Sequence, residues 1–247
     1  MKISILQFKS ELGNFDKNFK TVRRLIDGAK NSDVLILPEL WTTGYYPKPV
    51  ENFADVEGKR TAEFICAAAS ENNVNIIGGS TIAQVDGKIF NRCIVADRHG
   101  EVVNIYDKTH LFTFADEEKV FTAGKSFSVF ELDGVKCGVA ICYDLRFPEF
   151  IRKLALTGIE ILFVPAAWSL KRLTPRQILT KARAIENQFF VVFANSAGKS
   201  EFINPLGEVL AESSVGEEIL TADVDLIFRA EVIGKMNLLA DRNIFVD

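Results

Sequence analysis

Three residues that can take part in acyl transfer each end an apolar segment of the kind that forms a buried strand. Cys142 ends the run Gly138-Val-Ala-Ile-Cys142, and polar and charged residues follow it. Glu39 ends Val34-Leu-Ile-Leu-Pro-Glu39, and Lys108 ends Val102-Val-Asn-Ile-Tyr-Asp-Lys108. A thiol, a carboxylate and an ammonium are the groups that cysteine-dependent acyl transfer requires. The sequence therefore predicts a catalytic site at these strand ends.

The expected roles follow from ordinary acidities. A free cysteine is mostly protonated at neutral pH, so Cys142 needs a base before it can attack a carbonyl. Glu39 is the candidate base, because a carboxylate in a closed pocket has a raised pKa. Lys108 and the backbone N–H of Tyr143 are expected to stabilise the tetrahedral oxyanion. The amide nitrogen would leave as ammonia, and water would then hydrolyse the thioester.

The three segments resemble the signatures of the nitrilase superfamily of carbon-nitrogen hydrolases, which end in Glu, Lys and Cys in that order. The resemblance runs from Met1 to about Asp225. Tyr106-Asp-Lys-Thr-His-Leu-Phe112, Cys142-Tyr-Asp-Leu-Arg-Phe-Pro148 and Ala182-Arg-Ala-Ile-Glu-Asn-Gln188 are most similar to the branch that contains the omega-amidases and their bacterial relatives. One such motif would be weak, but three in order over this length are specific.

The resemblance also implies a second glutamate, between the lysine and the cysteine, that orients the lysine or the substrate amide. Glu117 and Glu118 are both candidates for this position. Gly124 fits the glycine that the family places seven residues after this glutamate, and this spacing selects Glu117.

Aromatic residues just beyond the strand ends are candidates for the walls of the pocket. Trp41 and Tyr45 follow Glu39, and Trp168 follows Pro165. We expect these side chains to overhang the nucleophile and contact the substrate, although packing as core lids explains them equally well.

Other polar residues near the motifs are interpreted as structural. His110 is expected to hold the lysine loop by hydrogen bonds rather than to act as a second base. Asp144, Arg146 and Glu149 are expected to form an ion-pair network that shapes the turn after the cysteine.

Composition excludes several classes of function. The chain has 247 residues, 48% hydrophobic and 25% charged, and a net charge of −4 without a basic cluster argues against nucleic-acid binding. No apolar stretch approaches the roughly 18 residues of a membrane span, and the N-terminal residues indicate a first strand rather than a signal peptide. We expect a small-molecule substrate, no nucleic-acid or membrane partner, and a cytoplasmic location.

Cysteine and histidine spacing indicates neither a metal site nor a disulfide framework. The cysteines show no Cys-x-x-Cys pair, and the chain has two histidines. We expect no metal and no cofactor. Apart from Cys142, the cysteines are expected to be inert packing residues: Cys66, Cys93 and Cys137.

Strand and helix patterns alternate without a linker or repeat, which predicts a single domain over residues 1–247. The resemblance implies that it is a carbon-nitrogen hydrolase domain. Short segments rich in Val, Ile and Phe predict strands at 2–8, 33–38, 74–80, 89–96, 101–106, 127–132, 135–141, 159–165, 189–195, 202–204, 208–211 and 218–224. Amphipathic patterns predict helices at 16–30, 61–72 and 174–187, with a fourth after Pro148. In the helix at 174–187 we expect Thr174-Pro175 at the start and Ile178, Ala182 and Ile185 on the buried face.

Roughly a dozen strands are too many for one open sheet with helices on both faces. Two stacked sheets covered by helices would bury each strand on both faces and explain the continuous apolar runs. The predicted fold class is therefore α/β, a four-layer α-β-β-α sandwich. The resemblance implies the same architecture, usually assembled through its helices as a homodimer or higher homo-oligomer.

The preferred hypothesis is an amidase that hydrolyses a small linear amide through a thioester and releases ammonia. The omega-amidase resemblance implies the terminal amide of a 2-oxo dicarboxylate monoamide as substrate. N-carbamoyl amides and deaminated-peptide amides stay open within the same chemistry, and a nitrile is least favoured. Two departures from the family pattern, Pro175-Arg176 and the short segment 198–203, fall near the expected pocket rim.

A catalytically silent scaffold on the same fold is the alternative from another class. Loss of Glu39, Lys108 or Cys142 would support that alternative, and all three residues are present.

Overall fold

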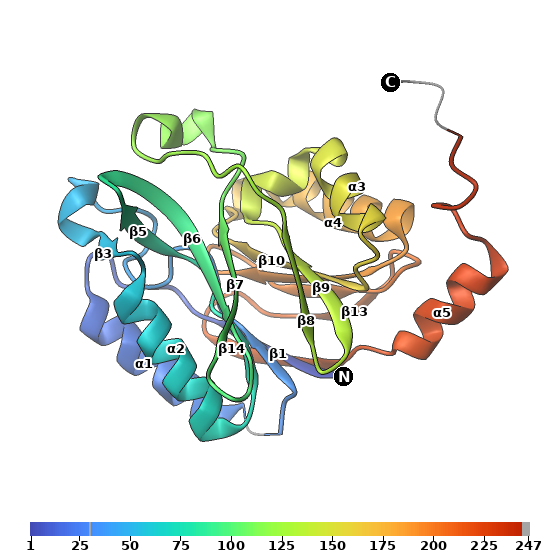
Figure 1. Cartoon of the computed structure of the whole chain (residues 1–247), viewed down its shortest axis with the longest axis horizontal. Helices are drawn as coiled ribbons and strands as arrows, with labels where there is room; N and C mark the ends of the chain where they lie inside the picture. The colour runs from blue at the N-terminus through green and yellow to red at the C-terminus, as the bar shows by residue number, and fades with distance from the viewer. Residues whose placement is uncertain (30, 244–247) are drawn as a thin grey trace.

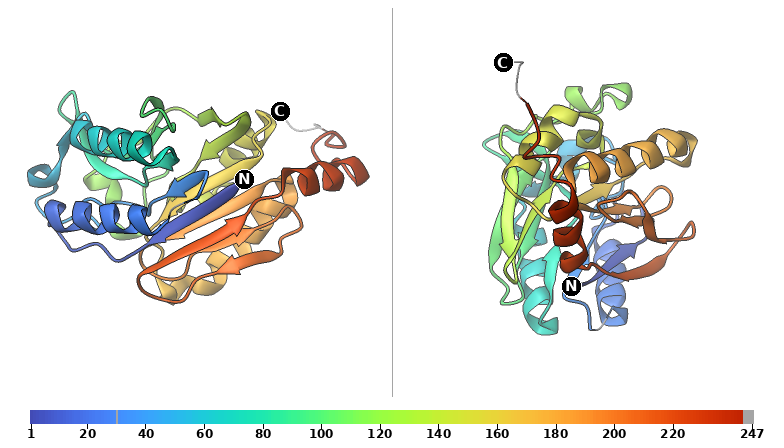
Figure 2. Two further views of the ribbon diagram at one scale, coloured as in Figure 1. Left: turned by 90° about the horizontal axis from the view of Figure 1, so that it is seen from below. Right: turned by 90° about the vertical axis from the view of Figure 1, so that its right-hand side faces the viewer.

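The chain folds into two β-sheets stacked face to face, with helices on both outer faces (Figures 1 and 2). The computed structural model describes residues 1–29 and 31–243. The first sheet contains β1 (Lys2–Gln7), β2 (Val34–Ile36), β3 (Asp55–Val56), β4 (Asn75–Ile77), β5 (Thr81–Val85), β6 (Lys88–Ala96), β7 (Val102–Asp107) and β14 (Glu218–Asp223). Its order is β14-β1-β2-β4-β6-β5-β3, and β7 pairs with β6.

The second sheet contains β8 (Ser128–Leu132), β9 (Val135–Val139), β10 (Ile161–Ala166), β11 (Phe190–Asn195), β12 (Glu201–Ile203) and β13 (Val209–Glu212). Its order is β13-β12-β11-β10-β9-β8. β9, β10 and β11 are parallel to one another, as are β1, β2 and β4. The carboxyl ends of parallel neighbours lie at the same edge of a sheet, which is where ligands bind in such folds.

Helices form the two outer layers. α1 (Phe15–Gly28) and α2 (Lys59–Asn72) cover the first sheet, and α3 (Pro148–Leu156) and α4 (Leu173–Asn187) cover the second (Figure 1). α5 (Leu226–Lys235) lies at the edge of the molecule, away from these layers (Figure 1). None of the helices in the described residues is long and apolar enough to cross a lipid bilayer.

The inner strands of the first sheet are buried on both faces, so successive residues enter different cores. In β2, Val34 and Ile36 pack between the two sheets, whereas Leu35 packs under α1 and α2. Ile3 and Ile5 of β1 also face the space between the sheets. Because side chains alternate along a strand, burial on both faces requires an unbroken apolar run. The predicted four-layer sandwich is confirmed.

Each segment predicted as a strand contains an observed strand, but the patterns do not predict β3, β5 or α5. β5 pairs with β6 in a hairpin whose turn is Asp86-Gly87, with φ of 49° and 74°. An Asp-Gly pair between two strands is a strong hairpin signal, because both residues tolerate positive φ. The Asp-Gly pair was therefore a sequence signal for β5, whereas β3 has only two residues, too few to form a pattern.

The buried face predicted for the helix at 174–187 is wrong. Ile178 and Ile185 of α4 are 60% and 45% exposed. The inward face instead carries arginines: Arg176 forms a buried ion pair of 2.7 Å with Glu201 of β12, and Arg183 donates to a backbone carbonyl. Apolar periodicity misjudged this face because the buried contacts of α4 are polar.

The start of α4 also differs from the prediction. The helix begins at Leu173 with Arg172 as its N-cap, so Thr174-Pro175 lies inside the first turn. Proline is tolerated there because the first N–H groups of a helix have no intrahelical partner.

Candidate active site

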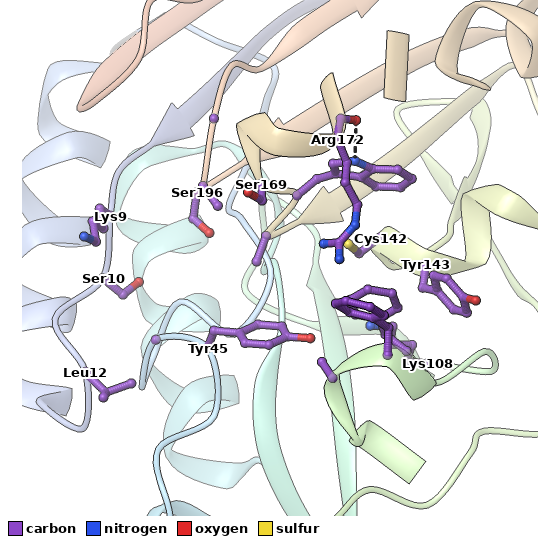
Figure 3. Close-up of a pocket in the computed structure, with 18 of the residues that line it drawn as sticks. Lys9, Ser10, Leu12, Tyr45, Lys108, Cys142, Tyr143, Ser169, Arg172 and Ser196 are labelled. Atoms are coloured by element: carbon purple, nitrogen blue, oxygen red, sulfur yellow. Dashed lines mark hydrogen bonds between the residues drawn. The ribbon is translucent and has the colours of Figure 1, made fainter. Parts of the chain in front are cut away.

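Strand ends from both sheets meet at one pocket, whose lining includes Lys108 and Cys142 (Figure 3). Lys108 directly follows β7 of the first sheet, and Glu39 lies three residues beyond β2. Cys142 begins the 3₁₀ turn Cys142–Arg146, three residues beyond β9 of the second sheet. The pocket has a volume of about 790 Å³. The fold therefore brings the thiol, the carboxylate and the ammonium to one place.

Lys108 is held by two buried carboxylates. Its Nζ donates to Glu39 Oε1 at 2.7 Å and to the two oxygens of Glu117 at 3.0 and 2.9 Å. Its side chain is 1% exposed, and those of both glutamates are fully buried. Burying an ammonium without partners would be costly, and the two carboxylates offset this cost. The lysine therefore keeps its charge.

Glu117, and not Glu118, is the glutamate that faces this site. The carboxylate of Glu117 also accepts a hydrogen bond of 2.8 Å from the Tyr45 hydroxyl and one of 2.8 Å from the backbone N–H of Phe112. Glu118 is exposed. The spacing to Gly124 therefore selected the residue that contacts the lysine.

Glu39 is fixed by three donors from different parts of the chain. Its Oε1 accepts from Lys108 Nζ and, at 2.9 Å, from Nδ2 of Asn91. Its Oε2 accepts from the backbone N–H of Ala167 at 3.0 Å. The carboxylate therefore has a single orientation, and it links the end of β2 to β6, β7 and β10.

The ionisation of the site follows from burial and from close charges. Burial raises the pKa of Glu39, and Glu117 raises it further, while Lys108 opposes the shift. Burial also raises the pKa of the Cys142 thiol well above its ordinary value, and the charge of Glu39 adds to this. Burial works to lower the pKa of Lys108, but the two carboxylates outweigh it, and the pKa is raised. The arrangement is a neutral thiol beside a carboxylate that can take its proton.

Cys142 sits on a turn with unusual backbone geometry. Its φ is 44°, in the left-handed region that residues other than glycine rarely adopt. Such a conformation persists only where the surroundings enforce it, and it is common at active sites. The backbone N–H of the next residue, Tyr143, has no hydrogen-bond partner among the described residues. This free donor belongs to the residue that directly follows Cys142 in the chain, as the predicted oxyanion role requires.

Asp144 ties the cysteine turn to the lysine loop. Its carboxylate accepts hydrogen bonds from the backbone N–H of Ile141 at 2.9 Å and from the Tyr106 hydroxyl at 2.7 Å. It also contacts the backbone N–H and the Nδ1 of His110, each at 2.8 Å. The ring of His110 stacks on Phe147 with centroids 3.8 Å apart. The hydrogen bonds expected of His110 are present.

The ion-pair network expected around Asp144 is wrong. Within the described residues, neither Arg146 nor Glu149 forms an ion pair with it, and Glu149 is exposed. The guanidinium of Arg146 instead lies 4.6 Å from the centroid of the Trp168 ring, at the pocket. Backbone and hydroxyl donors already satisfy the carboxylate, so it does not need the arginine.

Two of the three predicted wall residues, Tyr45 and Trp168, line the pocket, whereas Trp41 does not. Tyr143, predicted to act through its backbone N–H, also lines it. Trp41 is fully buried, and its ring packs 4.9 Å from that of Phe19 beneath the first sheet's helices. The prediction for Trp41 is wrong because the chain reverses after Glu39 and sends this side chain into the other core.

The pocket also has walls that the sequence patterns did not identify. Arg146 and Arg172 line it, and neither forms an ion pair with a described residue. The guanidinium of Arg172 stacks on Phe112 and Phe114, 5.2 and 4.6 Å from their ring centroids. Lys9 also lies on the pocket wall, across from Arg172 in Figure 3. The place of Arg146 in the cysteine motif was the one available signal for these cations.

Of the two departures from the family pattern, only one reaches the pocket. Gly198, together with Ser196 and Ala197 just before it, lines the wall. Pro175 is exposed on α4 and is absent from the lining. The short segment 198–203 is therefore the departure that shapes the site.

The remaining cysteines are placed for packing. Cys93 and Cys137 are buried between the sheets, and burial raises the pKa of each thiol. Cys66 is partly exposed, and all four cysteines are free. In the part of the chain that the structure describes, no group of three His, Cys, Asp or Glu residues is placed to hold a metal ion.

Comparisons with known proteins agree with this geometry. The sequence profile of the carbon-nitrogen hydrolase family matches residues 2–232. The chain belongs to the carbon-nitrogen hydrolase family. The predicted membership in the nitrilase superfamily and the predicted enzyme class, a carbon-nitrogen hydrolase, are thus confirmed.

Relatives of this family member include named amidases. It is 41% identical over 240 residues to a 2-oxoglutaramate amidase of Bacillus subtilis, covering 93% of each chain. It is 30% identical over 254 residues to an omega-amidase of Xenopus tropicalis, covering 94% of this chain and 91% of the other. Its structure matches that of a CN-hydrolase superfamily protein from Xanthomonas campestris with a TM-score of 0.92 and 28% identity, covering 100% and 98% of the chains.

Proposed function

We propose that this carbon-nitrogen hydrolase is a cysteine amidase that acts on a small linear amide bearing a carboxylate. The observation that carries the proposal is that Cys142 and Lys108 line one pocket, while the buried carboxylate of Glu39 accepts a hydrogen bond of 2.7 Å from the lysine. The resemblance of the chain to an omega-amidase and to a 2-oxoglutaramate amidase supports the substrate class.

In the proposed mechanism, Glu39 takes the proton of Cys142 as the sulfur attacks the amide carbon. The oxygen of the tetrahedral intermediate becomes negative and is stabilised by Lys108 and the free N–H of Tyr143. Glu39 then returns the proton to the nitrogen, the C–N bond breaks, and ammonia leaves a thioester on the sulfur. Glu39 next deprotonates water, which attacks the thioester and releases the carboxylic acid with the thiol restored.

Glu117 has a supporting role in this proposal. It holds Lys108 with two hydrogen bonds and is itself held by Tyr45. A lysine fixed in this way needs no reorganisation when the oxyanion forms, which is the condition for strong electrostatic stabilisation.

The cations of the pocket support an anionic substrate. Arg146 and Arg172 lie against the rings of Trp168 and Phe114, each 4.6 Å from the centroid. Stacking keeps the planar faces of the guanidinium groups occupied and leaves their N–H edges for a ligand. A guanidinium edge binds a carboxylate with two parallel hydrogen bonds. In this proposal they bind the carboxylate of a 2-oxo dicarboxylate monoamide while the terminal amide reaches Cys142.

An ammonia-release screen tests the proposal directly. The substrates are 2-oxoglutaramate, 2-oxosuccinamate, N-carbamoyl amino acids, simple aliphatic amides and nitriles, with Cys142→Ala as the blank. We expect release from the 2-oxo monoamides, none from the blank, and a KM at least about tenfold higher for Arg146→Ala, the effect of losing one charge-assisted hydrogen bond. A preference for uncharged amides would contradict the anionic substrate class.

Two other outcomes have defined meanings. Turnover of N-carbamoyl amino acids alone would support the N-carbamoyl alternative. The deaminated-peptide amide alternative is tested by amine release from an N-substituted 2-oxo amide, because cleavage of such an amide releases an amine rather than ammonia. Turnover of nothing by folded, reduced protein would support a catalytically silent scaffold.

We also propose that two copies pair through the outer face of α3 and α4. Ile178 and Ile185 lie two turns apart on α4 and are 60% and 45% exposed, and Leu156 at the end of α3 is 46% exposed. Apolar side chains gathered on one helical layer are typical of an interface. Sedimentation should give a dimer or a higher homo-oligomer, and Ile178→Asp should shift it towards monomer. A wild-type monomer at micromolar concentration would contradict this assembly.

A further inference from the structure

Asn91 is a buried residue that touches the candidate base and the candidate lysine without lining the pocket. It lies in β6 and is 0% exposed. Its Nδ2 donates to Glu39 Oε1 at 2.9 Å, and its backbone carbonyl accepts from the backbone N–H of Lys108 at 2.9 Å. One residue of the first sheet thus fixes two of the three groups proposed to react.

The donors are divided unequally between the two oxygens of Glu39. Oε1 accepts from both Lys108 Nζ and Asn91 Nδ2, whereas the one N–H group of the described residues that donates to Oε2 is the backbone N–H of Ala167. Each carboxylate oxygen has about two lone-pair sites in its plane. Oε1 is therefore filled, and Oε2 keeps one site that can take a proton.

We propose that Asn91 is a positioning residue that reserves Oε2 of Glu39 for proton exchange with Cys142 and with the hydrolytic water. This inference rests on the base role proposed for Glu39. Asn91 acts through Glu39 and does not contact the substrate. Without its donor, Oε1 would also have a free site, and the proton would be shared between a productive and an unproductive oxygen.

The surroundings of Asn91 show that the residue is held for its N–H group. Its Oδ1 is buried and has no hydrogen-bond partner among the described residues. Leaving a buried acceptor unpaired is unfavourable, so an asparagine placed only to join strands would be expected to use both ends. The reversed amide would set Oδ1 against the carboxylate of Glu39, which fixes the orientation.

The charges around Glu39 determine how loss of Asn91 alters the pH dependence. The titratable groups that face Glu39 are Lys108, Glu117, Cys142 and Tyr45. A hydrogen bond donated to a carboxylate favours its charged form, so removing the Asn91 donor raises the pKa of Glu39. The base is active when deprotonated, so the acid limb of the pH–rate profile moves to higher pH. We expect a shift of about one to two pH units, the worth of one hydrogen bond to a charged group.

The experiment compares Asn91→Ala with Asn75→Ala as a matched control. Asn75 is 1% exposed and hydrogen-bonds to Asp33 and Asp133, outside the pocket. Two profiles are measured from pH 5 to about pH 9: the rate of Cys142 alkylation by iodoacetamide, which needs no known substrate, and kcat and KM for ammonia release. Urea unfolding shows which variants are folded.

For Asn91→Ala we expect both acid limbs to move up by about one unit or more, with kcat at least about tenfold lower and KM within about threefold. For Asn75→Ala we expect lower stability and unchanged limbs. An unchanged limb and kcat in folded Asn91→Ala would reduce Asn91 to a packing residue and overturn the proposal.

Asn91→Asp provides a second test, which also applies if the alanine variant does not fold. A protonated Asp at this position can donate its O–H to Glu39 Oε1, whereas the ionised form repels it. We therefore expect this variant to approach wild-type rates at low pH and to lose activity as pH rises. A profile that matches the wild type over the whole range would overturn the proposal.

The outcomes also separate this inference from the proposed function. Specific alkylation of Cys142 with normal limbs in every Asn91 variant refutes the positioning role alone. A wild-type protein that is neither alkylated at Cys142 nor active on any amide refutes the proposed function and this inference with it.

Discussion

Replacing Lys108 with methionine should destabilise the protein strongly and in a pH-dependent way. The ammonium makes three hydrogen bonds of 2.7 to 3.0 Å to Glu39 and Glu117, and all three side chains are buried. Methionine fills similar space but leaves two carboxylates facing each other. Breaking a buried ion pair by removing one partner costs about 3–5 kcal/mol. For a chain of this length, a loss of about 1 kcal/mol of stability lowers Tm by roughly 2–4 °C, so Tm should fall by roughly 6–20 °C.

The sign of the pH dependence follows from the pKa of Glu39. Burial already raises this pKa in the wild type, and Lys108 opposes the rise. Without the lysine the pKa rises further, so the folded variant keeps a proton that the unfolded chain releases. The slope is about 1.4 kcal/mol per pH unit for each extra bound proton, and stability falls as pH rises through this window. The difference in unfolding free energy between the variant and the wild type should therefore widen by up to about 2.7 kcal/mol between pH 6 and pH 8.

Urea unfolding at pH 6 and pH 8 measures this gap. Lys88→Met is the control, because Lys88 is exposed in a hairpin and its replacement removes the same charge. Lys108→Met with Glu117→Gln should recover part of the loss, since one carboxylate is then neutral. A loss below about 1 kcal/mol at both pH values, or a gap that narrows as pH rises, would refute the description of the lysine as the counter-charge of two buried carboxylates.

Two further substitutions test how the site is held. Tyr45→Phe removes the 2.8 Å hydrogen bond to Glu117 and should lower kcat/KM by about tenfold, measured by ammonia release; an unchanged value would show that Glu117 needs no such support. Gly124→Ala would place a Cβ 2.0 Å from the carbonyl oxygen of Asp107, the residue before the lysine, and should lower both Tm and activity. The control is Gly234→Ala in α5, where the added Cβ has open space around it. This control should leave activity unchanged and raise helix stability by up to about 1 kcal/mol. Equal effects of the two alanines would contradict the close contact at Gly124.

The order of strands and helices could be predicted because each element leaves a local pattern. The unbroken apolar run before Glu39 indicates a strand buried on both faces, as β2 is. α4 shows where such patterns stop working. Its inward face carries Arg176, whose charge is neutralised by Glu201 from a strand that follows the helix in the chain. Hydrophobic periodicity cannot detect a buried position whose partner supplies the opposite charge.

The walls of the site were harder to predict than its reactive groups for a related reason. Trp41 and Tyr45 have similar positions after β2, yet one packs under the helices and the other contacts Glu117 in the pocket. Which way each side chain points depends on the path of the loop, and loops have no repeating pattern. Asn91 gave no signal, because its partner Glu39 lies far away in the sequence. Arg146 was signalled only by its place in the cysteine motif, since the ring of Trp168 that it contacts comes from another segment.

The sequence alone determined which chemical groups stand at the ends of apolar strands, because the length and polarity of a strand are local properties. It thereby placed Cys142, Glu39 and Lys108 at the mouth of a sandwich. Tertiary structure decided which of their atoms meet, since the thiol comes from one sheet and the other two groups come from the opposite sheet. Burial between the sheets then raises the pKa values of Glu39 and Cys142, and such shifts exist only after folding excludes water.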